Sequence, residues 1–172
     1  MNTVMENILS RRSVRAFEMK EIPADVLEQI LKAAIYAPSG MGRQTWQFTA
    51  VKDPEKIKKL AGIVEADLGR DGYDMYKPQV IIIPSNERDS SFGKEDNACA
   101  LENIFLAAHS FGIGSVWINQ LRDICDGPAA RALLREWGVP DSHVVYGIAA
   151  LGYPAAAAKK EVCKTGKIVI VD

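Results

Sequence analysis

The chain has 172 residues, of which 48% are hydrophobic and 25% are charged, a composition typical of one globular domain with a sizeable core. Its net charge of −1 argues against a general binder of nucleic acid or of membrane surfaces, although a local basic patch can still hold an anion. The three cysteines are far apart and form no CxxC pair, so we expect neither a disulfide framework nor a zinc site, and a cytoplasmic protein fits best.

Helix and strand patterns alternate through the first half of the chain. A short helix is expected over residues 5–10, in a terminus that lacks the apolar run of a signal peptide. A second helix begins at Pro23, because proline suits the first helical turn, and Pro38 ends it. A strand is expected over residues 46–51. The Asp53-Pro54 pair then begins a third helix, whose apolar face runs from Ile57 to Leu68.

The second half of the chain continues the alternation. Residues 80–83 are a β-branched run typical of a strand buried on both faces, and the polar residues 86–92 are expected to form a loop. The clearest helix covers residues 95–111, with Gly112 as its C-terminal cap. A strand over 115–119, a helix over 128–137 and strands over 144–151 and 168–171 follow. Residues 1–172 therefore read as one domain of about five strands and five helices, of α/β or α+β class.

Three arginines fall within five residues near the N-terminus: Arg11, Arg12 and Arg15, with Ser13 among them. Arginine holds phosphate through paired, charge-assisted hydrogen bonds. Residues 11 and 15 share one face of either a helix or a strand, so their side chains converge in both conformations, whereas Arg12 converges only if the backbone turns. Taken alone, such a run is more often a solvated basic turn.

Three further segments carry groups suited to a ligand, although each also reads as an ordinary connection or tail. Residues 37–46 join a helix to a strand, and their two glycines allow close approach to a flat ligand. Residues 112–120 lead from a Gly-Ile-Gly turn into a strand. Four lysines gather between residues 159 and 167.

The two histidines, His109 and His143, have no partner at a metal-ligand spacing, and His109 reads as a packing or surface residue of the long helix. No GxSxG elbow and no obvious carboxylate pair supports a catalytic triad or dyad. We therefore expect no metal site and no catalytic group supplied by the protein itself.

Taken in order, these segments resemble the nitroreductase family. RRSVRAF resembles the opening motif of that family, and APSGMGRQTWQF resembles its second motif, commonly APSxxNxQPW-F. AHSFGIGSVWIN resembles the stretch that passes the flavin ring, and GIAALGYP followed by a basic segment resembles the family's ending. The four motifs extend over nearly the whole chain.

The resemblance implies an α+β fold, with a mostly antiparallel sheet of about five strands flanked by helices, in an intertwined homodimer. One FMN would lie in each cleft at the dimer interface, and residues 168–171 would extend onto the partner's sheet. The implied activity is a ping-pong oxidation of NADH or NADPH with reduction of nitroaromatic, quinone or similar small acceptors. The flavin supplies the redox chemistry in such an enzyme.

By the same resemblance, four parts of the chain would bind FMN. The arginine segment and a late lysine would hold the phosphate and ribityl chain, and the second motif would line the ring from the other subunit. The backbone around residues 118–120 would approach the reactive edge of the flavin ring, where a backbone N–H stabilises the charge that develops at N5. The expected residues are Arg11, Arg12, Ser13, Arg15, Pro38, Ser39, Gly40, Gln44, Ile118, Asn119, Gln120 and Lys164.

Three positions depart from the family pattern. Gly42 stands where Asn is usual, so one hydrogen bond to the flavin is missing or comes from Arg43. Thr45 replaces a usual Pro, which loosens the turn. The late cation is commonly Arg, which leaves the register of Lys164 open.

Two other functions stay open at this point. One is a specialised relative that removes halogens, oxidises azoline rings or breaks down flavin, with the polar residues 86–92 narrowing its pocket. The other is an FMN-binding protein without turnover, serving storage or sensing, which the departure at Gly42 favours slightly.

Overall fold

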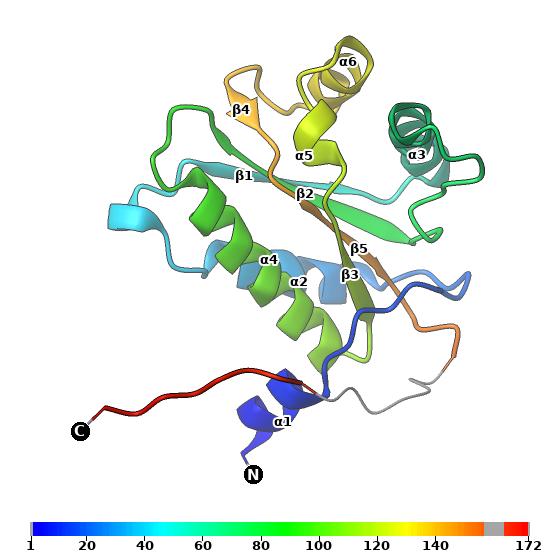
Figure 1. Cartoon of the computed structure of the whole chain (residues 1–172). Coiled ribbons are helices and arrows are strands. Elements are labelled where there is room, and N and C mark those ends of the chain that lie inside the picture. The colour runs from blue at the N-terminus through cyan, green and yellow to red at the C-terminus, as the bar shows by residue number, and fades with distance from the viewer. Residues whose placement is uncertain (1, 157–163, 172) are drawn as a thin grey trace.

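A five-stranded sheet, antiparallel at every pair of its strands, forms the middle of the protein (Figure 1). The computed structural model describes residues 2–156 and 164–171. The strands follow the order β1-β2-β5-β3, and β4 pairs with the end of β2. Their bounds are β1 Trp46–Val51, β2 Val80–Glu87, β3 Gly114–Ile118, β4 His143–Val144 and β5 Ile148–Gly152. The α+β fold and the antiparallel sheet implied by the resemblance are thus confirmed.

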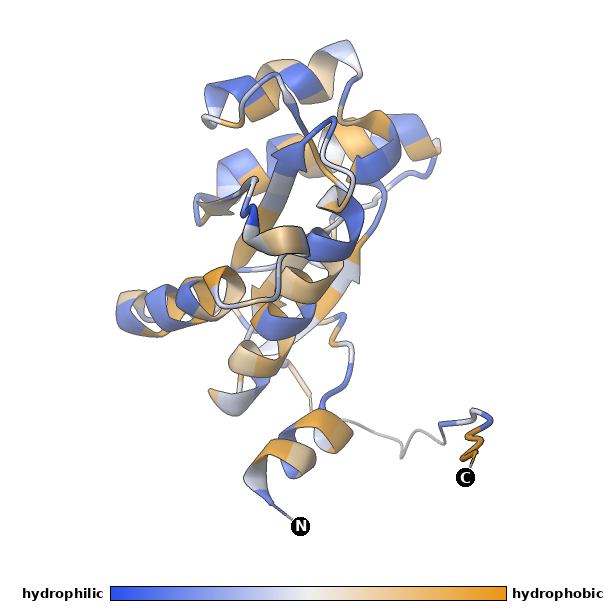
Figure 2. Cartoon of the chain, turned by 90° about the vertical axis from the view of Figure 1, so that its left-hand side faces the viewer, coloured by the Kyte–Doolittle hydropathy of each residue, from blue (hydrophilic) through white to orange (hydrophobic). Residues whose placement is uncertain are grey.

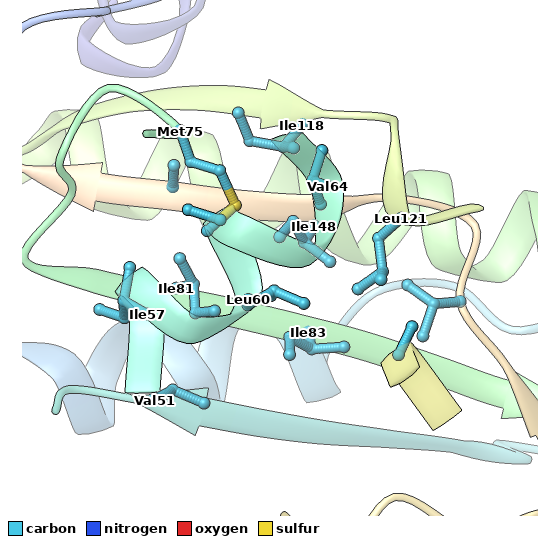
Figure 3. Close-up of a cluster of buried hydrophobic side chains, with 14 of the residues drawn as sticks. Val51, Ile57, Leu60, Val64, Met75, Ile81, Ile83, Ile118, Leu121 and Ile148 are labelled. Carbon is cyan, nitrogen blue, oxygen red and sulfur yellow. The ribbon is translucent and has the colours of Figure 1, made fainter. Parts of the chain in front are cut away.

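Helices cover both faces of the sheet (Figure 1). On one face, α2 and α4 pack against side chains such as Val80 and Ile82, and on the other, α3, α5 and α6 pack against side chains such as Ile81 and Ile83 (Figure 3). Strand β2 is therefore buried on both faces, as its β-branched run predicts. The bounds are α1 Thr3–Ser10, α2 Ala24–Ile35, α3 Pro54–Leu68, α4 Gly93–Ser110, α5 Leu121–Ile124 and α6 Pro128–Glu136, with a 3₁₀ turn at Gly40–Gly42.

Caps explain why several helix ends are readable from sequence. The Asp53 carboxylate accepts from the backbone N–H of Glu55 at 2.9 Å, and Pro54 occupies the first turn of α3. Gly69 and Gly138 follow α3 and α6 with φ of 57° and 79°, the left-handed backbone that favours glycine. The start of α3 at Pro54 agrees with the prediction, and the helix includes the expected apolar face as far as Leu68.

Two strand predictions are wrong at their ends. Strand β2 continues through Glu87, although residues 86–92 were expected to form a loop. The polar end is stabilised by side-chain pairing, since buried Ser85 Oγ lies 3.0 Å from His143 Nδ1. The expected strand 144–151 is broken into β4 and β5, and within the break Gly147 lies against Trp117, where a Cβ would come within 2.4 Å of Nε1.

Residues 168–171 form no strand within the described part of the chain, which corrects the expectation of a last strand there. Their side chains are 65–89% exposed although all four are apolar. Helix α1 is similar, because none of its residues is buried by the described chain. Both apolar segments lie outside the body of the fold (Figure 2). Among the described helices, none has the length and the hydropathy that crossing a membrane requires.

Candidate functional site

A cavity of about 490 Å³ lies where the segment after α1 passes the end of α4 and the start of β3. Residues 10–16 line it along their whole length. The opposite wall comes from His109 in the last turn of α4 and from the turn 112–115. Arg11, Arg12, Ser13 and Arg15 all line this one hollow. The spacing predicts convergence of Arg11 and Arg15, and that of Arg12 only if the backbone turns.

Backbone pairing holds this segment in place. The N–H of Val14 donates to Ser115 O at 2.9 Å, and Ser13 forms a parallel bridge with Ser115. Further along, the N–H of Glu18 donates to Tyr153 O at 2.8 Å. The segment therefore follows the edge strand β3 and reaches the end of β5.

Gly114 is required where the arginine segment touches β3. A Cβ at this position would lie 2.7 Å from Val14 Cγ2, too close for ordinary packing. We expect Gly114→Ala to lower the free energy of unfolding by about 1–3 kcal/mol, because Val14 and its neighbours must shift. Urea unfolding followed by circular dichroism measures this. Gly62→Ala, in α3 with open space around the new Cβ, is the matched control and should be neutral or slightly stabilising; equal losses in both variants would contradict the packing argument.

The three arginines differ in what they already bind. Arg12 Nη1 donates to Leu9 O at 2.6 Å and to Arg11 O at 2.8 Å, so this guanidinium caps the end of α1. Arg11 Nε lies 3.8 Å from Glu102 Oε1, and its guanidinium carbon is 5.8 Å from the centre of the Phe105 ring. Arg15 is exposed and has no ion pair within the described residues. Arg11 and Arg15 are therefore the cations with most capacity left for a ligand.

Two cavity residues were not among the expected ligand residues: Ser115, and His109, which the sequence reads as a packing or surface residue. Ser115 is 1% exposed, and its Oγ has no hydrogen-bond partner among the described residues. A buried hydroxyl in this state fits a polar ligand group in the cavity. His109 Nε2 lies 2.8 Å from Ser10 Oγ. The pKa of His109 is lowered, first by burial and then by the charges of Arg11 and Arg12.

The second expected part of the site lies at the other end of α4. The Asp96 carboxylate accepts from Ser39 Oγ at 3.0 Å and from the Gly40 N–H at 2.8 Å. Ser39 Oγ in turn accepts from the Gln44 N–H at 2.9 Å. The loop from Ser39 to Gln44 is thus fastened to the first turn of α4 by a buried carboxylate that the sequence did not single out.

Within one chain, these two parts do not meet. Helix α4 has 18 residues, so at 1.5 Å per residue its ends are about 27 Å apart. The arginine segment lies at its C-terminal end and the loop near Gly40 at its N-terminal end (Figure 1). They belong to two different surfaces of the chain.

The remaining expected residues lie outside the arginine cavity. Ile118 is buried in the core, and Asn119 and Gln120 lead from β3 into α5, about 17 Å along the chain from Ser115. Gln44 lines a separate hollow of about 430 Å³ between α2 and β1. Lys164 is exposed and does not line either hollow, and Lys159 and Lys160 lie outside the described residues.

The departures from the family pattern have structural counterparts. Gly42 has φ of 65°, a conformation that glycine adopts freely and that asparagine tolerates better than most residues. Thr45 Oγ1 donates to Asn86 Oδ1 at 2.6 Å, which fixes the position where Pro is usual. The Thr45 side chain thus has a hydrogen-bond partner on β2, and the expectation that Thr45 loosens the turn relative to Pro stays a prediction.

Comparison with known proteins finds similarity to nitroreductases and flavin reductases. The Nitroreductase family model matches residues 8–69 and 64–153. An Archaeoglobus fulgidus protein named "Putative NADH dehydrogenase/NAD(P)H nitroreductase" is 34% identical over 161 residues, covering 90% of this chain and 87% of the relative. A Bacillus subtilis protein named "FMN reductase (NADPH)" is 27% identical over 180 residues, covering 94% of this chain and 70% of the relative. The crystal structure of a nitroreductase with bound FMN from Bacteroides fragilis has a TM-score of 0.92, 44% identity and 100% coverage of both chains.

Proposed function

Because this chain belongs to the nitroreductase family, we propose that it is an NAD(P)H-dependent flavin oxidoreductase that binds FMN with the phosphate in the arginine cavity. The cavity itself is the observation that carries this proposal. It brings Arg11 and Arg15 together with the buried hydroxyl of Ser115, which has no hydrogen-bond partner among the described residues. A phosphate monoester has about −1.5 to −2 charges at neutral pH and three acceptor oxygens, which match these donors.

The chain's own residues would bind and orient the cofactor. Arg11 and Arg15 would pair with phosphate oxygens, and Arg12 would hold the backbone of the segment through the carbonyl groups that it already binds. The backbone from Ile118 to Gln120 continues β3 beyond Ser115 and would approach the reactive edge of the ring. When bound, FMN supplies the hydride and electron chemistry, so no protein nucleophile is required.

We also propose that the working unit is a homodimer. The loop near Ser39 and Gly40 would complete the site of the other subunit, since it lies about 27 Å from the arginine segment of its own chain. The exposed apolar side chains of α1 and of residues 168–171 need a partner surface. Among the described strands, the outer edge of β1 is unpaired and could take an added strand, whereas the edge at β3 already pairs with Ser13 and Val14. Such an interface would bury more than about 2,000 Å².

Removal of residues 168–172 is expected to weaken this dimer. Four exposed apolar side chains are lost, so the truncated chain should dissociate at protein concentrations where the full chain stays dimeric. Sedimentation equilibrium over a range of concentrations measures the change, and removal of Asp172 alone is the control. A truncated chain that remains as dimeric as the full chain would contradict a role for this segment in the interface.

The proposed kinetic scheme is ping-pong, in which the nicotinamide leaves before a nitroaromatic or quinone acceptor enters the same cleft. Initial rates measured over a grid of NADH or NADPH and of a nitrobenzene or benzoquinone should give parallel double-reciprocal lines. Intersecting lines would contradict the ping-pong order. Bound FMN without turnover of any acceptor would instead support a storage or sensing protein.

A further inference from the structure

The arginine cavity contains an imidazole beside its guanidinium groups. His109 lies in the last turn of α4 and lines the cavity with its neighbour Ser10. Ser10 Oγ is 2.6 Å from Glu6 O and 2.8 Å from His109 Nε2. A hydroxyl has one hydrogen, and Glu6 O can only accept, so Ser10 donates to Glu6 O and His109 Nε2–H donates to Ser10 Oγ. A proton added to His109 would then go to Nδ1.

The position of the cavity is unfavourable for an anion unless cations offset it. The C-terminal end of a helix has a partial negative charge, and the cavity lies at that end of α4. One cavity cation, Arg12, is occupied with backbone carbonyls, and Arg11 is close to Glu102. A further positive group at this end would therefore contribute directly to phosphate binding.

The groups that face His109 determine when it is charged. The segment after α1 contributes Arg11 and Arg12, and α1 contributes the Ser10 hydroxyl and the Glu6 carbonyl. On α4 itself, Glu102 is two turns away and close to Arg11, and the turn and strand over residues 112–118 have no charged residue. Without an anion, burial and the two arginines keep the imidazole neutral by lowering its pKa.

We propose that His109 is a ligand for the phosphate end of the flavin and takes up a proton when the phosphate binds. The inference rests on the proposed FMN site. A phosphate with about −2 charges favours imidazolium over imidazole, and the added donor offsets the helix end. By linkage, a group that is more protonated in the complex makes binding tighter as the pH falls through its titration range. At pH values above the pKa that His109 has in the complex, His109 is neutral both in the free protein and in the complex, so it adds no pH dependence to binding.

The phosphate itself titrates near the same range, with a second pKa of about 6, and this works in the opposite direction. The comparison must therefore be made between two proteins at each pH. His109→Gln is suitable, because a glutamine amide reaches as far as Nε2 and donates to Ser10 Oγ but does not titrate. The ratio of FMN affinities of the two proteins cancels the titration of the phosphate.

The experiment measures flavin binding to the apoprotein by fluorescence between pH 6.5 and 8.5, with FMN and with riboflavin, which has no phosphate. For FMN, the advantage of the unmodified chain over His109→Gln should increase as the pH falls, by about tenfold for each unit by which binding raises the pKa of His109. For riboflavin, the ratio should stay constant. His143→Gln, which replaces the other histidine of the sequence, should show the same pH dependence as the unmodified chain.

A ratio for FMN that is constant with pH would overturn the role of His109, while strong FMN binding and weak riboflavin binding would leave the phosphate site itself intact. Equal affinities for FMN and riboflavin at every pH would instead show that the arginine cavity does not hold the phosphate. Those two outcomes separate the failure of this inference from the failure of the proposed function.

Discussion

Replacement of both Arg11 and Arg15 with alanine is expected to weaken FMN binding by about 10²- to 10⁴-fold. Each charged hydrogen bond to a phosphate contributes on the order of 1.5–3 kcal/mol, and tenfold in affinity corresponds to about 1.4 kcal/mol. Both residues line the same cavity, and among the described residues neither guanidinium is bound to backbone carbonyl groups as that of Arg12 is. Fluorescence titration of the apoprotein with FMN measures the loss.

Two comparisons make this result specific. Riboflavin affinity should change much less in the double variant, because the missing partners are those of the phosphate. Arg135→Ala removes an exposed arginine on α6 that pairs with Asp141 and does not line the cavity, so it should leave FMN binding unchanged. An FMN affinity in the double variant equal to that of Arg135→Ala would place the phosphate elsewhere.

Asp96→Ala is expected to disorganise the loop from Ser39 to Gln44. The carboxylate of Asp96 is the acceptor for Ser39 Oγ and for the Gly40 N–H, and each donor left without a partner costs about 1–3 kcal/mol. We expect a loss of about 2–6 kcal/mol in the free energy of unfolding, together with weaker flavin binding if the loop lines the ring of the other subunit. Urea unfolding and FMN titration measure the two effects.

Neighbouring variants separate the contributions at this position. Glu95→Ala changes an exposed carboxylate in the same turn of α4 and should be nearly neutral. Asp96→Asn keeps an acceptor for the Gly40 N–H and should lose less than Asp96→Ala. If Asp96→Ala unfolds at the same urea concentration as Glu95→Ala, then the two hydrogen bonds do not stabilise the loop.

Local signals in the sequence predicted most of the elements, because their causes are local. The cap of Asp53 and the glycine after α6 set helix ends, and the β-branched run of β2 is buried on both faces. The end of β2 was missed because polar residues there are satisfied by a partner on β4 that is 58 residues away, at His143. Hydrophobic periodicity along the sequence does not reveal a hydrogen bond between residues so far apart.

In the candidate site, too, the sequence indicates groups that are neighbours along the chain and misses pairs that are distant in sequence. The arginine run lines one cavity, and its role in holding a phosphate stays a prediction. Ser10 and His109 are 99 residues apart and Ser39 and Asp96 are 57 apart, so no spacing rule pairs them. Which arginines are available to a ligand depends on where α1 ends, because the carbonyl groups of Leu9 and Arg11 at this end accept hydrogen bonds from Arg12. The resemblance, however, separated the second motif from the arginines by assigning it to another subunit, and the length of α4 supports that assignment.

The most direct test of the proposed activity is the visible spectrum of the purified protein, recorded without oxygen before and after addition of NADH or NADPH. The proposed function predicts a yellow protein with flavin absorption that is bleached by at least one of the two nicotinamides. A colourless protein that takes up no FMN when FMN is supplied would contradict it.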